Sequence, residues 1–207
     1  MVGKTLDELG VLDEVVPTHY SIKESVFPFN KFPGSAVQLG PEMKSTGEVM
    51  GIDVDLAMAF AKSQMAASAL LPMKGTIFIS VAGNDKQLMI PVAREFAAMG
   101  YSLIATTGTA AVFSAHGIPV QTIPKIQEGR PNLLDKMKNG EVSMIVNTPS
   151  GRSSKTDEGM IRTEAVTHRV TLITTVSAAL AAVAACRAMR EREMTVTALQ
   201  DWFPPKA

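Results

Sequence analysis

Polar and cationic side chains follow four apolar runs in the part of the sequence after residue 75, at the point where each run ends. They are Lys86 after the first run, Thr106 and Thr109 after the second, Lys125 after the third, and Asn147, Thr148, Ser150 and Arg152 after the fourth. Hydroxyls, glycine-exposed backbone N–H groups and helix N-termini all favour anions, and three of these side chains are cations. The residue types therefore predict a phosphate or carboxylate site.

Each of these groups also has an ordinary structural explanation. Ser, Thr and Asn are common helix caps, and a single lysine after a strand is usually a solvated surface charge. The recurrence of such groups after four successive runs favours ligand binding over capping. Nothing in the pattern requires catalysis.

The other residues that could do chemistry fit structural roles better. His19, His116 and His168 lack the spacing of metal ligands, and we expect His116 to cap the end of a helix. The single Cys186 lies in an Ala-rich stretch, which favours a buried structural thiol. We expect four acidic residues to lie on a solvated or interdomain surface: Glu42, Glu48, Asp53 and Asp55. The sequence thus predicts no metal site and no catalytic residue in this chain.

Repeated β-α units must position the anion-binding groups. Apolar runs predict strands at residues 76–81, 102–105, 120–123, 142–146 and 171–174. Amphipathic stretches predict one helix that begins at an Asn84 cap, holds Pro91 in an early turn or at a kink, and ends at Gly100. Further helices are expected at residues 110–116, 132–138 and 178–192. The alternation favours an α/β fold, a five-stranded parallel sheet flanked by helices, whose strands all end at one ligand-binding edge.

Composition narrows the classes of function. The chain has 207 residues, with 20 basic and 20 acidic side chains and a net charge of zero, which excludes a globally basic nucleic-acid binder. Residues 1–70 hold 5 basic and 9 acidic side chains, and the texture changes from Pro- and Gly-rich to β-α near residue 70. We therefore expect two domains, 1–70 and 71–207. One cysteine, the lack of a bilayer-length apolar run and the lack of a signal-peptide core favour a cytoplasmic protein.

Six segments resemble the C-terminal part of carbamoyl phosphate synthetase large subunits. They are SIKESVFPFNKFPG (21–34), LGPEMKSTGEVMGID (39–53), ATTGT (105–109), PKIQEGRPN (124–132), NTPSGR (147–152) and RTEAVTHRVTLITT (162–175). The first two resemble the tail of the second ATP-grasp half of that subunit. The others resemble its methylglyoxal synthase-like allosteric domain, so the resemblance implies a methylglyoxal synthase-like sheet preceded by a short ATP-grasp tail.

The resemblance also implies roles for individual residues. A nucleotide monophosphate effector, UMP- or IMP-like, would be bound by Ser80, Lys86, Thr106, Thr109, Lys125, Asn147 and Thr148. Glu24 and Thr174 match residues that bind ornithine between the two domains. The sequence departs from the enteric pattern at Thr107, Pro149 and Ile173, so the choice of effector stays open.

The parent enzyme implied by the resemblance makes carbamoyl phosphate from two ATP, bicarbonate and glutamine-derived ammonia, for arginine and pyrimidine synthesis. ATP and Mg²⁺ (or Mn²⁺) would bind upstream, so we expect a regulatory fragment or separately encoded piece with no cofactor of its own. Its expected partners are the rest of the large subunit, the glutaminase small subunit and an oligomer of itself, without nucleic acid or membrane. Two other functions stay open: a methylglyoxal synthase-type phosphate lyase, from whose base position Asp157 is displaced, and a purely structural oligomerisation module.

Overall fold

Five parallel strands form the central sheet of this protein. The computed structural model describes residues 3–14, 16–32, 37, 39–148 and 155–202. The strands are β3 (Thr76–Ser80), β4 (Ser102–Thr106), β5 (Gln121–Ile123), β6 (Met144–Asn147) and β7 (Thr171–Ile173), in the order β5-β4-β3-β6-β7. The predicted five-stranded parallel sheet is therefore confirmed.

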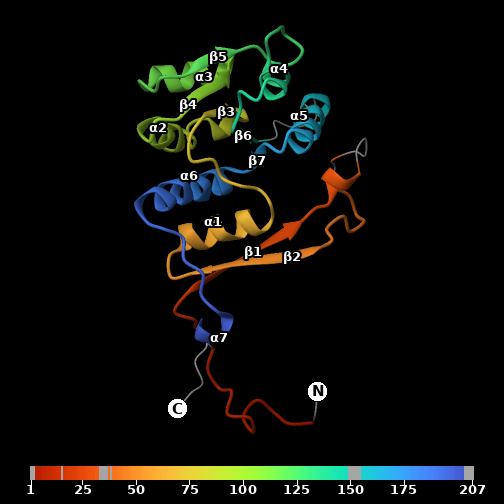
Figure 1. Ribbon diagram of the computed structural model, residues 1–207, viewed down its shortest axis with the longest axis vertical. Helices are drawn as coiled ribbons and strands as arrows, with labels where there is room; N and C mark the ends of the chain where they lie inside the picture. Colours follow the sequence, from red (N-terminus) through yellow and green to blue (C-terminus); the bar gives the residue numbers. More distant parts are fainter. Residues whose placement is uncertain (1–2, 15, 33–36, 38, 149–154, 203–207) are drawn as a thin grey trace.

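Helices cover both faces of this sheet (Figure 1). On one face pack α2 (Ile90–Ala98), α3 (Thr107–Ala115) and α6 (Val176–Glu191), and on the other α4 (Leu133–Lys138) and α5 (Lys155–Thr167). Side chains alternate across a strand, so Ile77 and Ile79 enter the first core while Phe78 enters the second. All three are at most 2% exposed. This two-sided burial explains why the strands read as apolar runs.

The first helix of the sheet region differs from the prediction. Asn84 does not cap it: residues Gly83–Asp85 form a 3-10 turn, and α2 begins only at Ile90 with Pro91 in its first turn. Proline lacks an N–H and is tolerated where no intrahelical donor is needed, so it fixes the start of the helix. Leu88, expected on the buried face, lies before this start and is 57% exposed. The predicted end at Gly100 is confirmed by its left-handed φ of 85°.

The sequence pattern missed helix α5 entirely. It falls in the polar stretch between the fourth and fifth strands, where only Ile161 and Ala165 are buried among the described residues of the helix. Two apolar residues four positions apart give too weak a periodicity to mark a helix.

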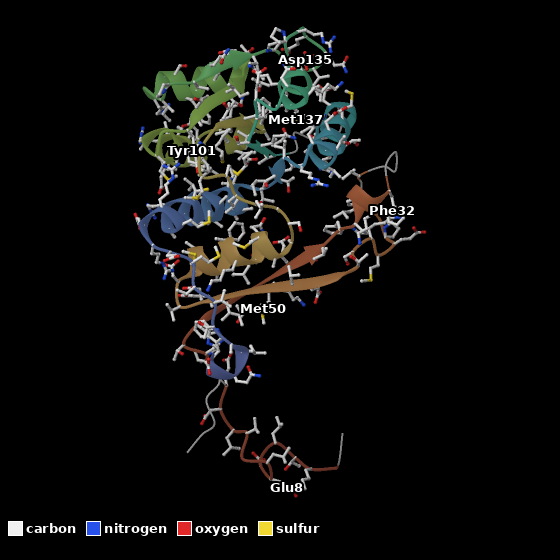
Figure 2. The ribbon with its side chains drawn as sticks, viewed as in Figure 1. Glu8, Phe32, Met50, Tyr101, Asp135 and Met137 are labelled. Carbon is white, nitrogen blue, oxygen red and sulfur yellow. The ribbon has the colours of Figure 1, made fainter. Side chains whose placement is uncertain are left out.

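Residues 1–70 contain regular structure that was also missed. Strands β1 (Tyr20–Val26) and β2 (Gly47–Asp53) form an antiparallel pair, followed by α1 (Leu56–Ala66); the short helices η1 (Phe29–Lys31) and α7 (Leu199–Trp202) complete the fold. Met50 lies on the face of this pair turned away from α1 (Figure 2) and is 50% exposed. The opposite face carries Glu24 opposite Val49 and Ile22 opposite Gly51. A glutamate and a glycine among the inward positions obscure the apolar alternation that would mark a strand pair.

Helix α1 connects the two parts of the molecule. It packs on the strand pair on one side and on α6 on the other, so the sheet, α6, α1 and the strand pair lie in successive layers (Figure 1). Met58 and Ala61 of α1 belong to the same hydrophobic core as the strands of the sheet. A core that crosses residue 70 couples the two parts, and the domain boundary expected there stays a prediction.

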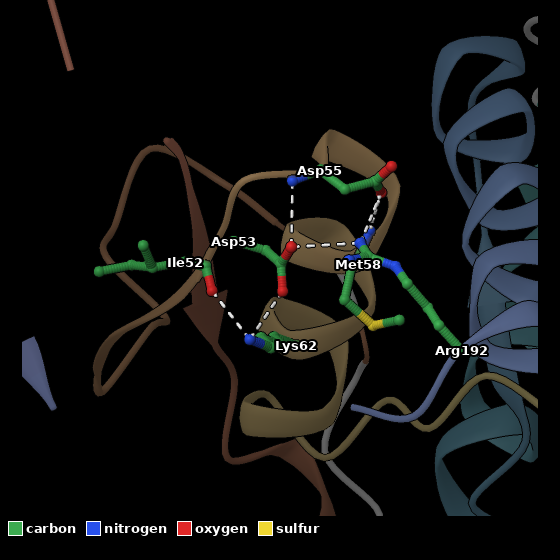
Figure 3. Close-up of polar contacts among 6 residues, drawn as sticks. All are labelled: Ile52, Asp53, Asp55, Met58, Lys62 and Arg192. Carbon is green, nitrogen blue, oxygen red and sulfur yellow. Dashed lines mark hydrogen bonds and ion pairs between the residues drawn. The ribbon is translucent and has the colours of Figure 1, made fainter. Parts of the chain in front are cut away.

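Asp53 is not on a solvated surface, which corrects the expectation for this residue. Only 4% of it is exposed, and its carboxylate accepts from Lys62 Nζ at 2.8 Å, Arg192 Nη2 at 3.1 Å and the Asp55 N–H at 3.0 Å (Figure 3). Burial acts to raise the pKa of Asp53, but these hydrogen bonds and the charge of Lys62 outweigh burial and lower it. The pairing fastens the end of α6 to β2 and α1.

The other acidic residues of this segment do meet solvent. The side chains of Glu42 and Glu48 are 83% and 54% exposed. Asp55 is 46% exposed and caps α1, because its Oδ1 accepts from the Met58 N–H at 2.8 Å.

A polar cluster holds the connection between α1 and β3 against the rest of the fold. The Tyr101 hydroxyl donates to the Pro72 carbonyl oxygen, and the Arg190 guanidinium donates to the carbonyl oxygens of Met73 and Met99. Burial raises the pKa of Tyr101 to about 12. Cys186 is fully buried, which confirms the structural thiol.

Two smaller observations complete the fold. His116 ends α3 and its Nδ1 lies 2.8 Å from the Val112 carbonyl oxygen, which confirms the expected cap. Within the ranges that the structure describes, no helix is long and apolar enough to cross a bilayer.

Candidate functional site

A pocket of about 280 Å³ lies at the carboxyl edge of the parallel sheet. Strand β3 is central, and the chain passes from it first to β4 on one side and later to β6 on the other. Ligands of open α/β sheets bind where the strand order reverses in this way. The ends of four strands and the turns after them line the pocket with Ser80, Lys86, Thr106, Thr109, Lys125, Asn147 and Thr148. Seven residues predicted for the anion site therefore line one cavity.

Hydroxyl groups form the floor of this pocket. Ser80 Oγ lies 2.9 Å from Thr106 Oγ1, which joins the ends of β3 and β4. Thr148 Oγ1 accepts from the Ala82 N–H at 2.9 Å, and Thr109 Oγ1 accepts from the Val81 N–H at 3.4 Å. The three threonines are at most 7% exposed. Each hydroxyl that accepts from a backbone N–H keeps its own proton available to donate, so these groups suit an anionic ligand.

The start of α3 distinguishes the capping explanation from the binding one. Thr106 occupies the N-cap position but makes no side-chain cap hydrogen bond. The first N–H groups of a helix have no partner within the helix, and they carry a partial positive charge. Lys86 adds a full charge here: a Cβ built on Gly108 would lie 2.9 Å from Lys86 Nζ, so the ammonium group rests directly against the helix start. This arrangement can hold a phosphate.

Lys125 lies at the same pocket, but its ammonium group already has a partner. Its Nζ is 3.2 Å from Glu128 Oε1, and its backbone N–H donates to Glu128 Oε2 at 3.2 Å. The backbone hydrogen bond, followed by the side-chain one, lowers the pKa of Glu128. Both side chains are about half exposed, so Lys125 meets solvent as well as the pocket.

Helix α5 adds two acidic residues that the sequence pattern did not assign to the site. Asp157 and Glu158 line the pocket from the first turn of this helix. Asp157 Oδ1 accepts from Gln127 Nε2 at 3.2 Å. The adjacent acidic pair in KTDEG was visible in the sequence, but without the helix nothing indicated that it would face this pocket.

Four predicted site residues are not brought into this pocket. Ser150 and Arg152 lie outside the described residues. Glu24, half-buried on β1, accepts from Gln64 Nε2 at 2.8 Å, and Thr174 is exposed just after β7. No described contact joins Glu24 to Thr174. Across the described ranges there is likewise no group of three or more His, Cys, Asp or Glu side chains that could hold a metal ion.

Comparison with known proteins identifies relatives of this chain. Residues 88–174 match the family model described as the MGS-like domain. The chain is 46% identical over 204 residues to the carbamoyl phosphate synthase large chain of Nostoc sp., which covers 99% of this chain and 18% of the relative. It is 51% identical over 200 residues to the large chain of Rhodopirellula baltica, which covers 97% and 18%. The chain thus spans less than a fifth of the length of these curated relatives.

A solved structure is also similar in part. Methylglyoxal synthase from Elizabethkingia anophelis NUHP1 aligns with 55% of this chain and 79% of its own, at 17% identity and a TM-score of 0.44. The family match covers β4 to β7, and the similarity to the large chains extends it to the strand pair, α1 and β3. This chain therefore contains an MGS-like domain and is homologous, over almost its whole length, to one part of the carbamoyl phosphate synthase large chains.

Proposed function

We propose that this chain is a regulatory segment of a carbamoyl phosphate synthase large chain and that its pocket binds a nucleoside monophosphate such as UMP or IMP. The observation that carries the proposal is the convergence of Ser80, Thr106, Thr109 and Lys86 at the start of α3. A phosphate dianion there would accept hydrogen bonds from hydroxyls and helix N–H groups and pair with one ammonium group. A volume of about 280 Å³ is near the lower end of small-molecule pockets, which suits a ligand of this size.

The activity of the whole parent protein is part of the same proposal. The relatives are large chains of a ligase, and such a chain would make carbamoyl phosphate from ATP, bicarbonate and glutamine-derived ammonia, with ATP and Mg²⁺ or Mn²⁺ bound outside this segment. Its partners would be the rest of the large chain and the glutaminase subunit, in the cytoplasm. Ornithine would bind near Glu24 and Thr174, with its ammonium group on the Glu24 carboxylate.

Regulation requires the effector to bind two states of the whole subunit unequally. The candidate route is the contact between α6 and α1, because α1 packs on both the MGS-like domain and the strand pair. The Asp53–Arg192 ion pair and the hydrogen bond from Thr171 Oγ1 to the Leu70 carbonyl oxygen, 2.7 Å long, cross the same junction.

A thermal-shift and calorimetric panel of UMP, IMP, ornithine and inorganic phosphate tests effector binding. A ligand at 100 times its dissociation constant stabilises the fold by about 2.7 kcal/mol, which raises Tm by about 5–11 °C in a chain of this size. Lys86→Met should weaken nucleotide binding at least about tenfold, because one charge-assisted contact is lost. Lys74→Met, an exposed lysine outside the pocket, is the matched control and should leave binding unchanged.

The same panel separates the alternative functions. A purely structural oligomerisation module would give no shift with any ligand, and that result would refute the effector site. The presence of Asp157 in the pocket favours testing a phosphate lyase as the second candidate, because it puts a carboxylate beside the phosphate-binding groups. We expect no methylglyoxal from dihydroxyacetone phosphate; turnover that Asp157→Asn abolishes would establish the lyase instead.

A further inference from the structure

The pocket has two chemically opposite walls. One wall is formed by the hydroxyls at the strand ends and by Lys86 against the start of α3. The other is formed by the first turn of α5, which presents Asp157 and Glu158 to the same cavity. An anion site that only had to hold phosphate would gain nothing from carboxylates on its far side, since like charges repel.

An ordinary explanation for the two carboxylates is that acidic residues stabilise the first turn of a helix through its dipole. That explanation accounts for their place in the sequence but not for the pocket they face. Any solvent-facing position of the same turn would serve the dipole equally well. Since both carboxylates line the cavity, a ligand that fills it meets them.

The charge balance of the pocket limits the ligand further. Among the described lining residues, the cations are Lys86 and Lys125 and the anions are Asp157 and Glu158. The Lys125 ammonium group is paired with Glu128, at 3.2 Å. The described part of the pocket therefore has no surplus of positive charge, and each phosphoryl group beyond the first would add repulsion without a new cation to offset it.

We infer that Asp157 and Glu158 determine the specificity of the pocket: they accept hydrogen bonds from the hydroxyl or amino groups of the ligand and exclude ligands with more than one phosphoryl group. This rests on the proposed function, and it narrows the ligand class to phosphomonoesters that carry donor groups at the end away from the phosphate. Inorganic phosphate lacks these donors, and nucleoside di- and triphosphates carry too much charge. A unit charge about 8 Å from a carboxylate changes affinity by a factor of about ten to thirty at an effective dielectric constant of about 20.

Calorimetric titration of the chain with UMP, UDP, UTP and inorganic phosphate, in buffer without divalent cations, tests the inference. UMP should bind at least about tenfold more tightly than UTP and than inorganic phosphate. Asp157→Asn and Glu158→Gln should each reduce the preference for UMP over UTP to about threefold or less, mainly by tightening UTP. Glu164→Gln is the matched control: it removes a charge from the same helix, at a residue that pairs with His168 and does not line the pocket.

The outcomes separate the two proposals. If the chain binds UMP and UTP equally, or if both pocket variants keep the preference of the unchanged chain, the inference about α5 is wrong while the nucleotide site stands. If the unchanged chain binds no nucleotide, the proposed function fails and this inference fails with it. A preference lost equally in Glu164→Gln would show a general charge effect and would also overturn the inference.

Discussion

Replacing Asp53 by asparagine should destabilise this protein more than any other isosteric change of a single carboxylate in the strand pair and α1. The side chain of Asp53 is 6% exposed and that of its partner Lys62 is 15% exposed, with 2.8 Å between the carboxylate and the ammonium group. The substitution keeps the shape but leaves the Lys62 charge buried without a counter-charge. Breaking a buried pair on one side costs about 3–5 kcal/mol.

We expect the lower end of this range, because Lys62 Nζ also donates to the Ile52 carbonyl oxygen at 3.1 Å and keeps that contact (Figure 3). A loss of about 3 kcal/mol corresponds to a fall in Tm of about 6–12 °C for a chain of this size. Asp55→Asn is the control, since Asp55 is 46% exposed and asparagine caps a helix as well as aspartate; it should cost less than about 1 kcal/mol.

The effect should depend on pH in a defined direction. Because the hydrogen bonds lower the native pKa of Asp53 below 3.8, its ionised form contributes stability at pH values above 3.8 and loses that contribution as the pH falls through the native pKa. The difference in free energy of unfolding between the unchanged chain and Asp53→Asn should therefore be constant from about pH 5 to 8 and shrink below about pH 4.

Urea denaturation followed by circular dichroism, at several pH values, measures this difference. The double variant Asp53→Asn with Lys62→Met should recover most of the loss, because it removes the unpaired charge. A loss in Asp53→Asn no larger than that in Asp55→Asn, or a double variant no more stable than the single one, would refute the reasoning.

Three further substitutions test other contacts. Gly108→Ala should weaken nucleotide binding about threefold to tenfold in calorimetry with little change in Tm, because its Cβ would displace the flexible Lys86 ammonium group. Gly51→Ala should cost at least about 2 kcal/mol in urea denaturation, because its Cβ would overlap backbone atoms of α1 that cannot move aside. Thr171→Val should cost about 1 kcal/mol, through loss of the 2.7 Å hydrogen bond to the Leu70 carbonyl oxygen; a loss below about 0.3 kcal/mol would mean that this junction is not held by that bond.

The sheet could be predicted from the sequence because its strands are buried on both faces. Such strands need an unbroken run of apolar residues, as in Thr76–Ser80, and that requirement is local. The parallel order then puts all strand ends at one edge, so the grouping of Ser80, Thr106 and Thr148 at one pocket follows from topology.

The strand pair and α5 could not be predicted in the same way. Their buried positions include a glutamate, a glycine and widely spaced small residues, and these elements are stabilised by what packs on them from elsewhere in the chain. Glu24 lies inward because Gln64 of α1 donates to it, 40 positions away. No local periodicity can record such a partner.

The sequence by itself determined the order of strands and helices and the residue types that gather at the carboxyl edge, because backbone geometry fixes both once the apolar runs are read. Only the tertiary structure decided which charges are neutralised. It paired Lys125 with Glu128, faced Asp157 toward the phosphate-binding wall, and buried Asp53 against Arg192, 139 positions away. The physical reason is that the state of a charge depends on its solvation and on the groups within a few ångströms, which the chain brings together only when it folds.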